Sequence, residues 1–280
     1  MALEDEFGDV IRKARTGLGL EIADVAGRTG IPERDVRSME VYTRRPAPAE
    51  VEAIAATLGL RAIALLALAN DEITAPDGPW TTGDLTVFRA TTHYPSHCYV
   101  IAAPSGACAI VDPGDDDVVD HVATLATSGG RHPVAILLTH GHGDHVGGLA
   151  AMHARLGVPV HVHEADADRS GSVGPGTLQC FSDAGARHAI DDLHWHAMPT
   201  PGHTAGSTTF VFASGNGGAA FCGDTMFAAS AGNARAGYAR HLASLRDGIG
   251  ALPPATVLYP GHGPATTVND ERRHNPFLLG

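Results

Sequence analysis

The stretch from Thr139 to Gly148 constrains this chain most, because it places three histidines and an aspartate within six residues. The apolar run 134–138 comes directly before it and is typical of a buried strand. Imidazole and carboxylate groups are ligands that borderline divalent metals prefer. The glycines between them let the backbone turn tightly enough for neighbouring side chains to converge. The stretch therefore predicts a metal site, since a solvated histidine-rich loop would need no such spacing.

Three further candidate ligands occur downstream in similarly glycine-rich settings. They are His203 in Pro-Gly-His-Thr, Asp224 in Cys-Gly-Asp-Thr and His262 in Pro-Gly-His-Gly-Pro. With these residues the chain resembles the metallo-β-lactamase-fold hydrolases, in which a His-x-His-x-Asp-His motif is followed by separate His, Asp and His motifs in that order. The resemblance extends from about residue 80 to residue 280.

The resemblance implies an α+β fold, a four-layer αββα sandwich with the ligands gathered at one edge. The apolar pattern agrees with it, because two β-rich halves are each followed by helical segments. We expect strands at 85–90, 97–102, 107–111, 134–138, 159–163, 193–198, 207–213, 218–222 and 256–259, and helices at 115–128, 146–156 and 242–252.

The family pattern also implies how the ligands divide between two divalent metal ions. Zinc is the first choice for this mixed nitrogen and oxygen set, with iron and manganese as alternatives. The family places an aspartate such as Asp112 beneath the metal loop, although a plain Asp-Pro-Gly turn explains this residue equally well. His97 is expected to be a strand-end histidine without a metal role. The first ion would be held by His140, His142 and His203, the second by Asp144, His145 and His262, and Asp224 would bridge both.

The resemblance implies that a metal-bridging hydroxide attacks an electrophilic carbonyl, with Asp144 and Asp224 as the catalytic residues. The segment 271–278 resembles the ending of short glyoxalase II-like hydrolases, which act on glutathione thioesters. Two features depart from that pattern. The segment 231–235 lacks the usual Gly-Cys-Gly, and no long helical substrate domain follows His262. We therefore expect a small acyl substrate, a thioester, ester or lactone, without assigning glutathione.

Two other functions remain as alternatives. One is a mononuclear iron oxygenase similar to the persulfide dioxygenases, against which the presence of His145 and His262 argues. The other is a DNA-binding regulator whose metallo-domain senses a metabolite. A net charge of −12, from 19 basic and 31 acidic residues, argues against general affinity for nucleic acid or an anionic membrane.

The first seventy residues contain several short helical patterns, and Gly30-Ile31-Pro32 separates the second from the third. They resemble a Cro/repressor-type helix-turn-helix domain, in which the helix 33–42 would present Arg34 and Arg37 to DNA. Residues 1–70 nevertheless hold nine basic and eleven acidic residues. We therefore expect a module that is structural or that forms a homodimer, in preference to one that binds DNA tightly. The helices are expected at 9–15, 21–29, 33–42, 49–58 and 62–69.

Composition and turn residues complete the predicted organisation. Residues 1–70 form the helical module, 71–83 the linker with Pro76-Asp77-Gly78-Pro79, and 84–280 the hydrolase domain. The chain has no run of about 18 apolar residues, and its acidic start lacks the features of a signal peptide, so we expect a cytoplasmic protein. The four widely spaced cysteines are expected to be free thiols, mostly buried.

Overall fold

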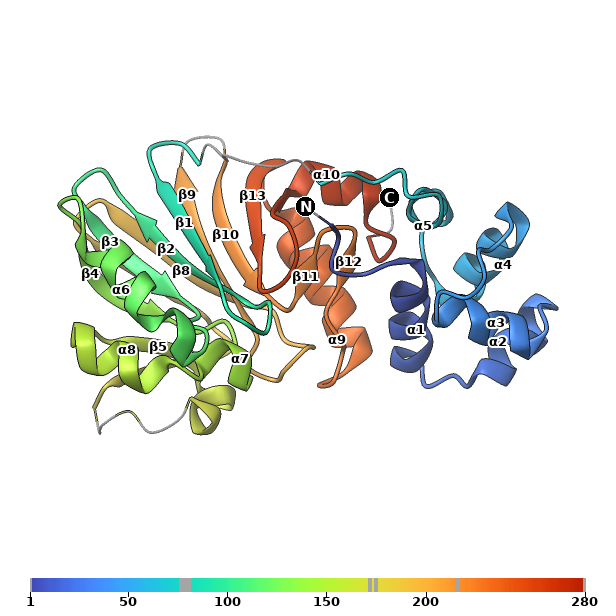
Figure 1. The fold of residues 1–280 in the computed structure, drawn as a ribbon, viewed down its shortest axis with the longest axis horizontal. Coiled ribbons are helices and arrows are strands. Elements are labelled where there is room, and N and C mark those ends of the chain that lie inside the picture. The colour runs from blue at the N-terminus through green and yellow to red at the C-terminus, as the bar shows by residue number, and fades with distance from the viewer. Residues whose placement is uncertain (1, 76–81, 171–172, 174–175, 215–216, 279–280) are drawn as a thin grey trace.

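Two six-stranded sheets pack face to face in the computed structural model, which describes residues 2–75, 82–170, 173, 176–214 and 217–278 (Figure 1). In the first sheet the order is β1-β2-β3-β4-β5-β6, and in the second it is β14-β13-β10-β9-β8-β7. The first sheet consists of β1 (Thr86–Thr91), β2 (His97–Ala102), β3 (Ala107–Val111), β4 (His132–Leu137), β5 (Val160–His163) and β6 (Leu178–Phe181). The second consists of β7 (Ala186–Ile190), β8 (Leu193–Pro199), β9 (Thr208–Ser214), β10 (Gly217–Gly223), β13 (Ala255–Pro260) and β14 (Thr266–Thr267). A small separate ribbon pairs β11 (Met226–Phe227) with β12 (Ser230–Ala231).

The strand β2 shows why apolar runs become central strands in this fold. All six of its residues are buried, although they alternate between the two faces of the sheet. Tyr99 and Ile101 pack between the sheets with Phe210 and Phe221, whereas Val100 faces the outer helices. A strand that is covered on both sides has no solvated face, so it is apolar throughout and does not alternate with polar residues.

Helices cover the outer face of each sheet. On the first sheet they are α6 (Val119–Thr127) and α8 (Leu149–Leu156), whose apolar residues pack on β2, β3 and β4. On the second sheet they are α9 (Tyr238–Ala243), the adjoining turns 244–251, and α10 (Val268–His274). The structure thus confirms the predicted α+β sandwich of four layers.

One predicted helix, 146–156, is divided in the structure. A short helix, α7 (Gly143–Val146), carries part of the metal loop, and α8 begins only at Leu149. Between them, Gly148 packs so closely on the preceding segment that a Cβ there would lie 2.8 Å from Val119 Cγ2 and 3.0 Å from the Asp115 carbonyl oxygen. The break coincides with this tertiary contact. The predicted helix 242–252 is likewise divided among α9, a π-helical turn 244–248 and a 3-10 turn 249–251.

The short elements β6, β7, β11, β12, β14 and α10 were not anticipated. The edge strands β6 and β7 are largely exposed or half-buried, so they lack the apolar run or the clean alternation that would predict them. All four cysteines are free. Cys98, Cys108 and Cys222 are buried, whereas Cys180 on β6 is exposed.

Residues 2–70, the described part of the N-terminal module, fold into five helices, as predicted. The second and third are joined at Gly30, which adopts a φ of 75° and ends the second helix. On the third helix Arg34 and Arg37 are exposed. The resemblance to a helix-turn-helix domain stays a prediction. The helices are α1 (Phe7–Gly17), α2 (Ile22–Thr29), α3 (Glu33–Glu40), α4 (Pro48–Leu58) and α5 (Ala62–Ala69).

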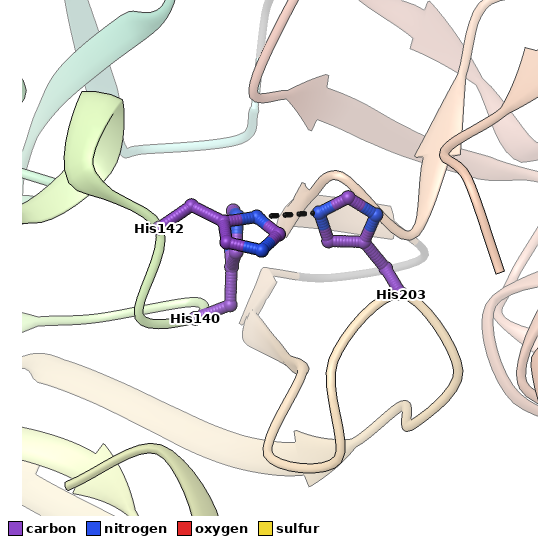
Figure 2. Close-up of side chains that lie close together, drawn as sticks. All are labelled: His140, His142 and His203. Carbon is purple, nitrogen blue, oxygen red and sulfur yellow. Dashed lines mark hydrogen bonds between the residues drawn. The ribbon is translucent and has the colours of Figure 1, made fainter. Parts of the chain in front are cut away.

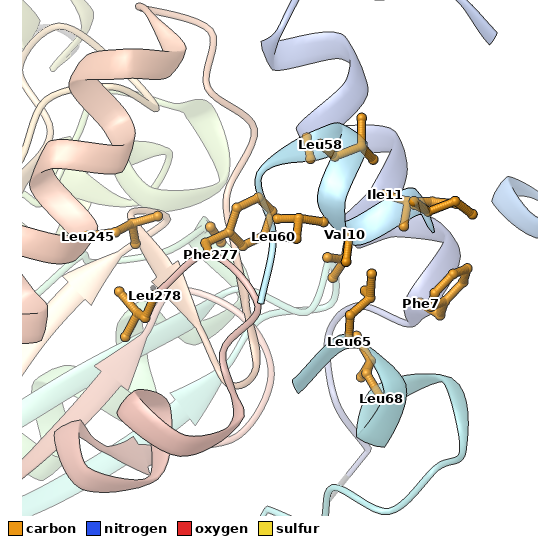
Figure 3. Packing of buried hydrophobic residues seen from close by; sticks show 14 of the residues in the cluster. Phe7, Val10, Ile11, Leu58, Leu60, Leu65, Leu68, Leu245, Phe277 and Leu278 are labelled. Carbon is orange, nitrogen blue, oxygen red and sulfur yellow. The ribbon is translucent and has the colours of Figure 1, made fainter. Parts of the chain in front are cut away.

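These helices share one hydrophobic core with the second sheet and its outer helices (Figure 3). Val10, Leu60 and Leu65 belong to the same buried cluster as Phe277 and Leu278, which follow α10. The backbone continues the contact, because the N–H of Arg61 donates to the carbonyl of Pro276 over 2.8 Å. The helical module is therefore packed against the outer helices of the second sheet (Figure 1).

The boundary predicted between the helical module and the hydrolase domain separates two parts of the sequence, but residues from both parts belong to this one core. The predicted linker 71–83 lies partly outside the described residues, since 76–81 are not described. No helix within the described ranges is long and apolar enough to cross a membrane.

Replacing Phe277 by alanine should destabilise the module and the sandwich together. The ring lies in the shared core, so its loss should lower the free energy of unfolding by about 3–5 kcal/mol. Urea denaturation followed by circular dichroism and by tryptophan fluorescence should give one transition, shifted equally for both probes. Ile63→Ala on the 71% exposed Ile63 is the control and should shift little. Two separate transitions in the wild-type protein would contradict the shared core.

Candidate metal centre

Four loops meet at one end of the two sheets and bring the predicted ligands together. The loop after β4 carries His140 to His145, and the turn between β8 and β9 carries His203. Asp224 directly follows β10, and His262 follows β13. Because β10 and β13 are parallel neighbours, their carboxyl ends deliver Asp224 and His262 to the same edge.

The first group consists of His140, His142 and His203 (Figure 2). One ring nitrogen from each lies within 4.8 Å of the others. Nδ1 of His142 and Nε2 of His203 are 2.9 Å apart, and the rings of His140 and His203 meet edge to face with centroids 4.9 Å apart. Three imidazoles that converge in this way can share one cation.

The second group consists of Asp144, His145 and His262. Oδ2 of Asp144 lies 3.3 Å from Nε2 of His262 and 3.5 Å from Nε2 of His145. His145 is fully buried, whereas the side chain of Asp144 is 39% exposed. Asp144 is thus the member of this group that faces solvent.

Asp224 lies between the two groups. Its Oδ2 is 3.5 Å from Nε2 of His203 in the first group and 3.6 Å from Nε2 of His262 in the second. Its Oδ1 is 3.3 Å from Nε2 of His145. The loop at Gly261 passes so close that a Cβ there would lie 2.3 Å from Asp224 Oδ1, so this position accepts no larger residue.

Several buried nitrogen and oxygen atoms at the centre are suited to bind a cation. Within the described part of the chain, Nε2 of His140, Nε2 of His145 and Oδ1 of Asp224 form no hydrogen bond of acceptable geometry, although the last two atoms lie 3.3 Å apart. An unpartnered buried polar atom is costly, and three at one point suit a ligand that takes all of them. The nitrogen and carboxylate set matches zinc and neighbouring divalent metals.

The surroundings shift the pKa values of the histidines of the centre in different directions. Burial lowers the pKa of His203 to about 4 and the pKa of His140 well below its usual value, so both rings are neutral and ready to ligate. Burial also acts to lower the pKa of His145, but the charge of Asp224 and the hydrogen bond to Asp112 raise it well above the usual value. Burial acts to raise the pKa of Asp224, whereas His145 and the other histidines lower it well below its usual value. Asp224 is therefore a carboxylate.

A set of acceptors beneath the ligands orients their rings. Asp112 accepts hydrogen bonds from the backbone N–H of Thr139 over 2.7 Å and from its hydroxyl over 2.6 Å, and it lies 3.0 Å from Nδ1 of His145. Nδ1 of His203 lies 2.9 Å from the Asn233 carbonyl oxygen. A ring that donates from Nδ1 turns Nε2 toward the centre, which is the usual arrangement around metal-binding histidines. The place expected for Asp112 thus agrees with the structure.

His97, His161 and His163 lie outside the two groups. Nε2 of His97 is 2.7 Å from the Gly263 carbonyl oxygen. His161 packs against the ring of His188, and Nε2 of His163 lies 3.1 Å from Oδ1 of Asp183. Each therefore has a structural environment of its own.

Asp166 was not anticipated, although it joins two ligand loops. Its buried carboxylate accepts hydrogen bonds from the N–H of Gly141 over 3.0 Å, the hydroxyl of Thr204 over 2.6 Å and the N–H of Gly206 over 3.2 Å. Gly141 lies between His140 and His142, and Thr204 follows His203. The segment 164–169 shows an ordinary mixture of polar residues, so the sequence carries no signal for this role.

Comparisons with known proteins agree with the geometry. Residues 91–262 match the family profile described as the metallo-beta-lactamase superfamily. An uncharacterised protein of Mycobacterium bovis is 34% identical over 209 residues, which cover 66% of this chain and 93% of the relative. A hydroxyacylglutathione hydrolase of Anaeromyxobacter dehalogenans is 38% identical over 171 residues, which cover 60% of this chain and 61% of that relative.

Solved structures show the same similarity. The crystal structure of the BLEG-1 B3 metallo-beta-lactamase superposes with a TM-score of 0.59 and 28% identity, covering 70% of this chain and 100% of that one. The di-iron-bound form of TTHA1623 superposes with a TM-score of 0.56 and 31% identity, covering 68% of this chain and 100% of that one. In both superpositions about a third of this chain has no counterpart in the matched structure.

Replacing Asp166 by alanine should loosen the first ligand group without removing a ligand. The change leaves the N–H groups of Gly141 and Gly206 without their acceptor, so the loops of His140 and His203 lose their common anchor. We expect metal affinity to fall by about 10–100-fold, the usual effect of losing such a supporting partner. Competition with a chromophoric chelator measures it. Asp168→Ala, on an exposed residue of the same turn, is the control. Equal affinities for both variants would contradict the anchoring role.

Proposed function

The chain belongs to the metallo-β-lactamase superfamily, and on that premise we propose that it is a metal-dependent hydrolase of a thioester, ester or lactone. The observation that carries the proposal is the convergence of seven side chains from four loops, with Asp224 within 3.6 Å of histidines in both groups. These residues are His140, His142, Asp144, His145, His203, Asp224 and His262.

We propose that the centre holds two divalent ions. His140, His142 and His203 would hold one, Asp144, His145 and His262 the other, and Asp224 would contact both. Zinc is our first choice, and the di-iron relative supports iron as an alternative. When bound, such ions polarise a carbonyl group and make water nucleophilic near neutral pH.

The side chains of the chain itself would position the reacting groups. The hydrogen bond with His262 lowers the pKa of Asp144, so this residue is a carboxylate beside the centre. Because its side chain is partly exposed, it can accept a hydrogen bond from a water molecule and pass a proton toward the leaving group. Asp224 would hold the two groups at a constant separation. We assign these two aspartates as the catalytic residues.

The substrate class rests on similarity and on chemistry. The relative named hydroxyacylglutathione hydrolase supports a thioester. Glutathione itself is not assigned, because segment 231–235 departs from the pattern of the glutathione-specific enzymes and offers one exposed cation, Arg235. An oxygenase with a single iron ion is the less favoured alternative, since the second group of ligands would then bind no metal ion.

Protein purified without chelators should contain close to two metal ions per chain. His145→Ala or His262→Ala should lower the content toward one, because each removes a ligand of the second group only. Elemental analysis beside protein quantitation measures it, with His194→Ala on an exposed histidine as the control. One ion per chain in fully active wild-type protein would contradict the dinuclear centre and favour the oxygenase.

Hydrolysis should depend on both aspartates, in different ways. Asp224→Ala should abolish turnover together with metal binding, because this carboxylate contacts both groups. Asp144→Asn should retain part of the metal and lose most of kcat, about 100-fold or more, because an amide accepts no proton. In ¹⁸O-labelled water the label should enter the acid product.

The measurement is a panel of thioesters, esters and lactones followed by thiol release and by mass spectrometry. Asp183→Asn, on an exposed residue beside His163, is the matched control and should keep wild-type activity. Oxygen consumption by iron-loaded protein without turnover of any acyl compound would refute the hydrolase proposal.

We propose that the helical module is mainly structural and binds DNA weakly. Its nine basic residues are outnumbered by eleven acidic ones, whereas phosphate contacts require a surplus of positive charge. The side chain of Arg34 is 86% exposed and forms an ion pair with Asp35 over 3.4 Å.

A gel-shift selection with random duplex DNA at physiological salt should therefore yield no specific complex tighter than the roughly 10⁻⁸ M of dedicated regulators. A tighter complex that is lost in an Arg34→Ala, Arg37→Ala double variant would contradict the structural role. An Arg28→Ala, Arg187→Ala double variant, at two exposed arginines outside α3, is the control for loss of the same charge.

A further inference from the structure

The start of the chain lies against the loop that carries His262. A Cβ placed on Gly263 would lie 3.0 Å from Cβ of Glu4 and 3.2 Å from its backbone nitrogen, so the two segments touch backbone to backbone. Gly263 adopts a φ of 73°, which favours glycine and permits this approach. The N-terminal segment 2–6 thereby flanks one of the ligand loops.

A buried polar cluster fastens the segment in place. Asp5 forms an ion pair with Lys13 of α1 and accepts a hydrogen bond from the hydroxyl of Ser230 over 2.6 Å. Lys13 donates to the carbonyl of Ala231 over 2.8 Å and lies over the ring of Phe227, 5.0 Å from its centroid. Removing either charge would leave the other buried and unpaired, so this attachment is specific.

The same cluster contacts the walls of the metal centre. The ring of Phe227 meets the ring of His262 edge to face, with centroids 5.8 Å apart. Gly232, next to Ala231, packs so tightly that a Cβ there would lie 1.9 Å from the Asp224 carbonyl oxygen and 3.1 Å from Nδ1 of His203. The N-terminal segment is therefore anchored to the two loops that border the centre.

Glu4 brings a negative charge to this border. The residue is exposed, unlike its neighbour Asp5, whose charge is met by Lys13. Burial of part of the side chain raises the pKa of Glu4. The neighbouring charges act in both directions, since His262 and Lys13 lower this pKa and Asp5 and Asp224 raise it. Because its Cβ lies beside Gly263, the residue that follows His262, the side chain stands at the border of the centre, where its charge can act on a charged substrate.

We propose that Glu4 is a specificity-determining residue, which favours acyl substrates that carry a positively charged group and disfavours those that carry a negative one. The proposal rests on the hydrolase function proposed above. It gives the helical module a role at the active site, since α1 holds the segment in place through Lys13. Such a preference would differ from that of enzymes for the doubly carboxylated glutathione.

The test uses acyl compounds that differ only in a permanent charge. One series is acetylthiocholine, S-acetyl-2-mercaptoethanol and S-acetyl-2-mercaptoethanesulfonate, in which the leaving group is cationic, neutral or anionic. A second series places a trimethylammonio or sulfonate group on a butyryl chain with 2-mercaptoethanol as the leaving group. In at least one series, Glu4→Gln should lower the ratio of kcat/KM for the cation to that for the anion by about three- to tenfold. Glu4→Lys should invert the preference.

Glu6→Gln is the matched control, because it removes the same charge two residues away at the start of α1 and should leave the ratio unchanged. The effect of Glu4→Gln should shrink as salt rises from 20 to 500 mM, since partly exposed charges are screened. A folding defect would instead lower kcat/KM for all members of a series alike.

A binding measurement separates failure of this inference from failure of the proposed function. The thiols thiocholine and 2-mercaptoethanesulfonate are titrated calorimetrically into metal-loaded wild-type and Glu4→Gln protein, where Kd should change in opposite directions. If no acyl compound is hydrolysed but the thiols respond as expected, the hydrolase proposal fails and the role of Glu4 in selecting charge stands. If hydrolysis occurs and neither the kcat/KM ratio nor the thiol affinities change, the role of Glu4 is overturned and the hydrolase proposal stands.

Discussion

The fold has to hold the Asp224 carboxylate, which is almost entirely removed from water, among three histidines. An isolated charge in such a place would cost several kcal/mol, so it persists only with close partners of opposite or adaptable charge. His145, His203 and His262 surround it at 3.3 to 3.6 Å. Asp112, on the far side of His145, raises the pKa of that ring together with Asp224. In this site the negative charges of the aspartates and the neighbouring histidines stabilise one another.

Rigid strands make that balance possible. Asp224 and His262 follow adjacent parallel strands, and the turn between β8 and β9 supplies His203. Glycines allow the loops to approach, as at Gly261, where a larger residue would collide with Asp224. Asp112 and Asp166 then tie the loops together from outside the ligand set. Supporting contacts of this kind fix the orientation of metal ligands.

The helical module extends this organisation beyond the sandwich. Its apolar residues complete the core over the second sheet, and its polar residues Asp5 and Lys13 attach to β12 beside the centre. Apolar burial supplies most of the attachment energy, whereas the buried ion pair fixes the position. A module joined in this way can take part in substrate selection while the chemistry stays with the seven residues of the loops.

The sequence by itself determined the local features of this protein. The spacing in 140–145 and the glycine-flanked His203, Asp224 and His262 predicted which side chains would gather, and the apolar runs at 97–102 and 107–111 predicted the strands β2 and β3. These signals are short in range, because each depends on neighbours within a few residues. Tertiary structure decided the rest. The close contact at Gly148 divided a predicted helix, Asp166 became a link between two ligand loops, and Glu4 reached Gly263 across more than 250 positions of sequence. Such contacts depend on where distant segments meet in space, so no local pattern of residues records them.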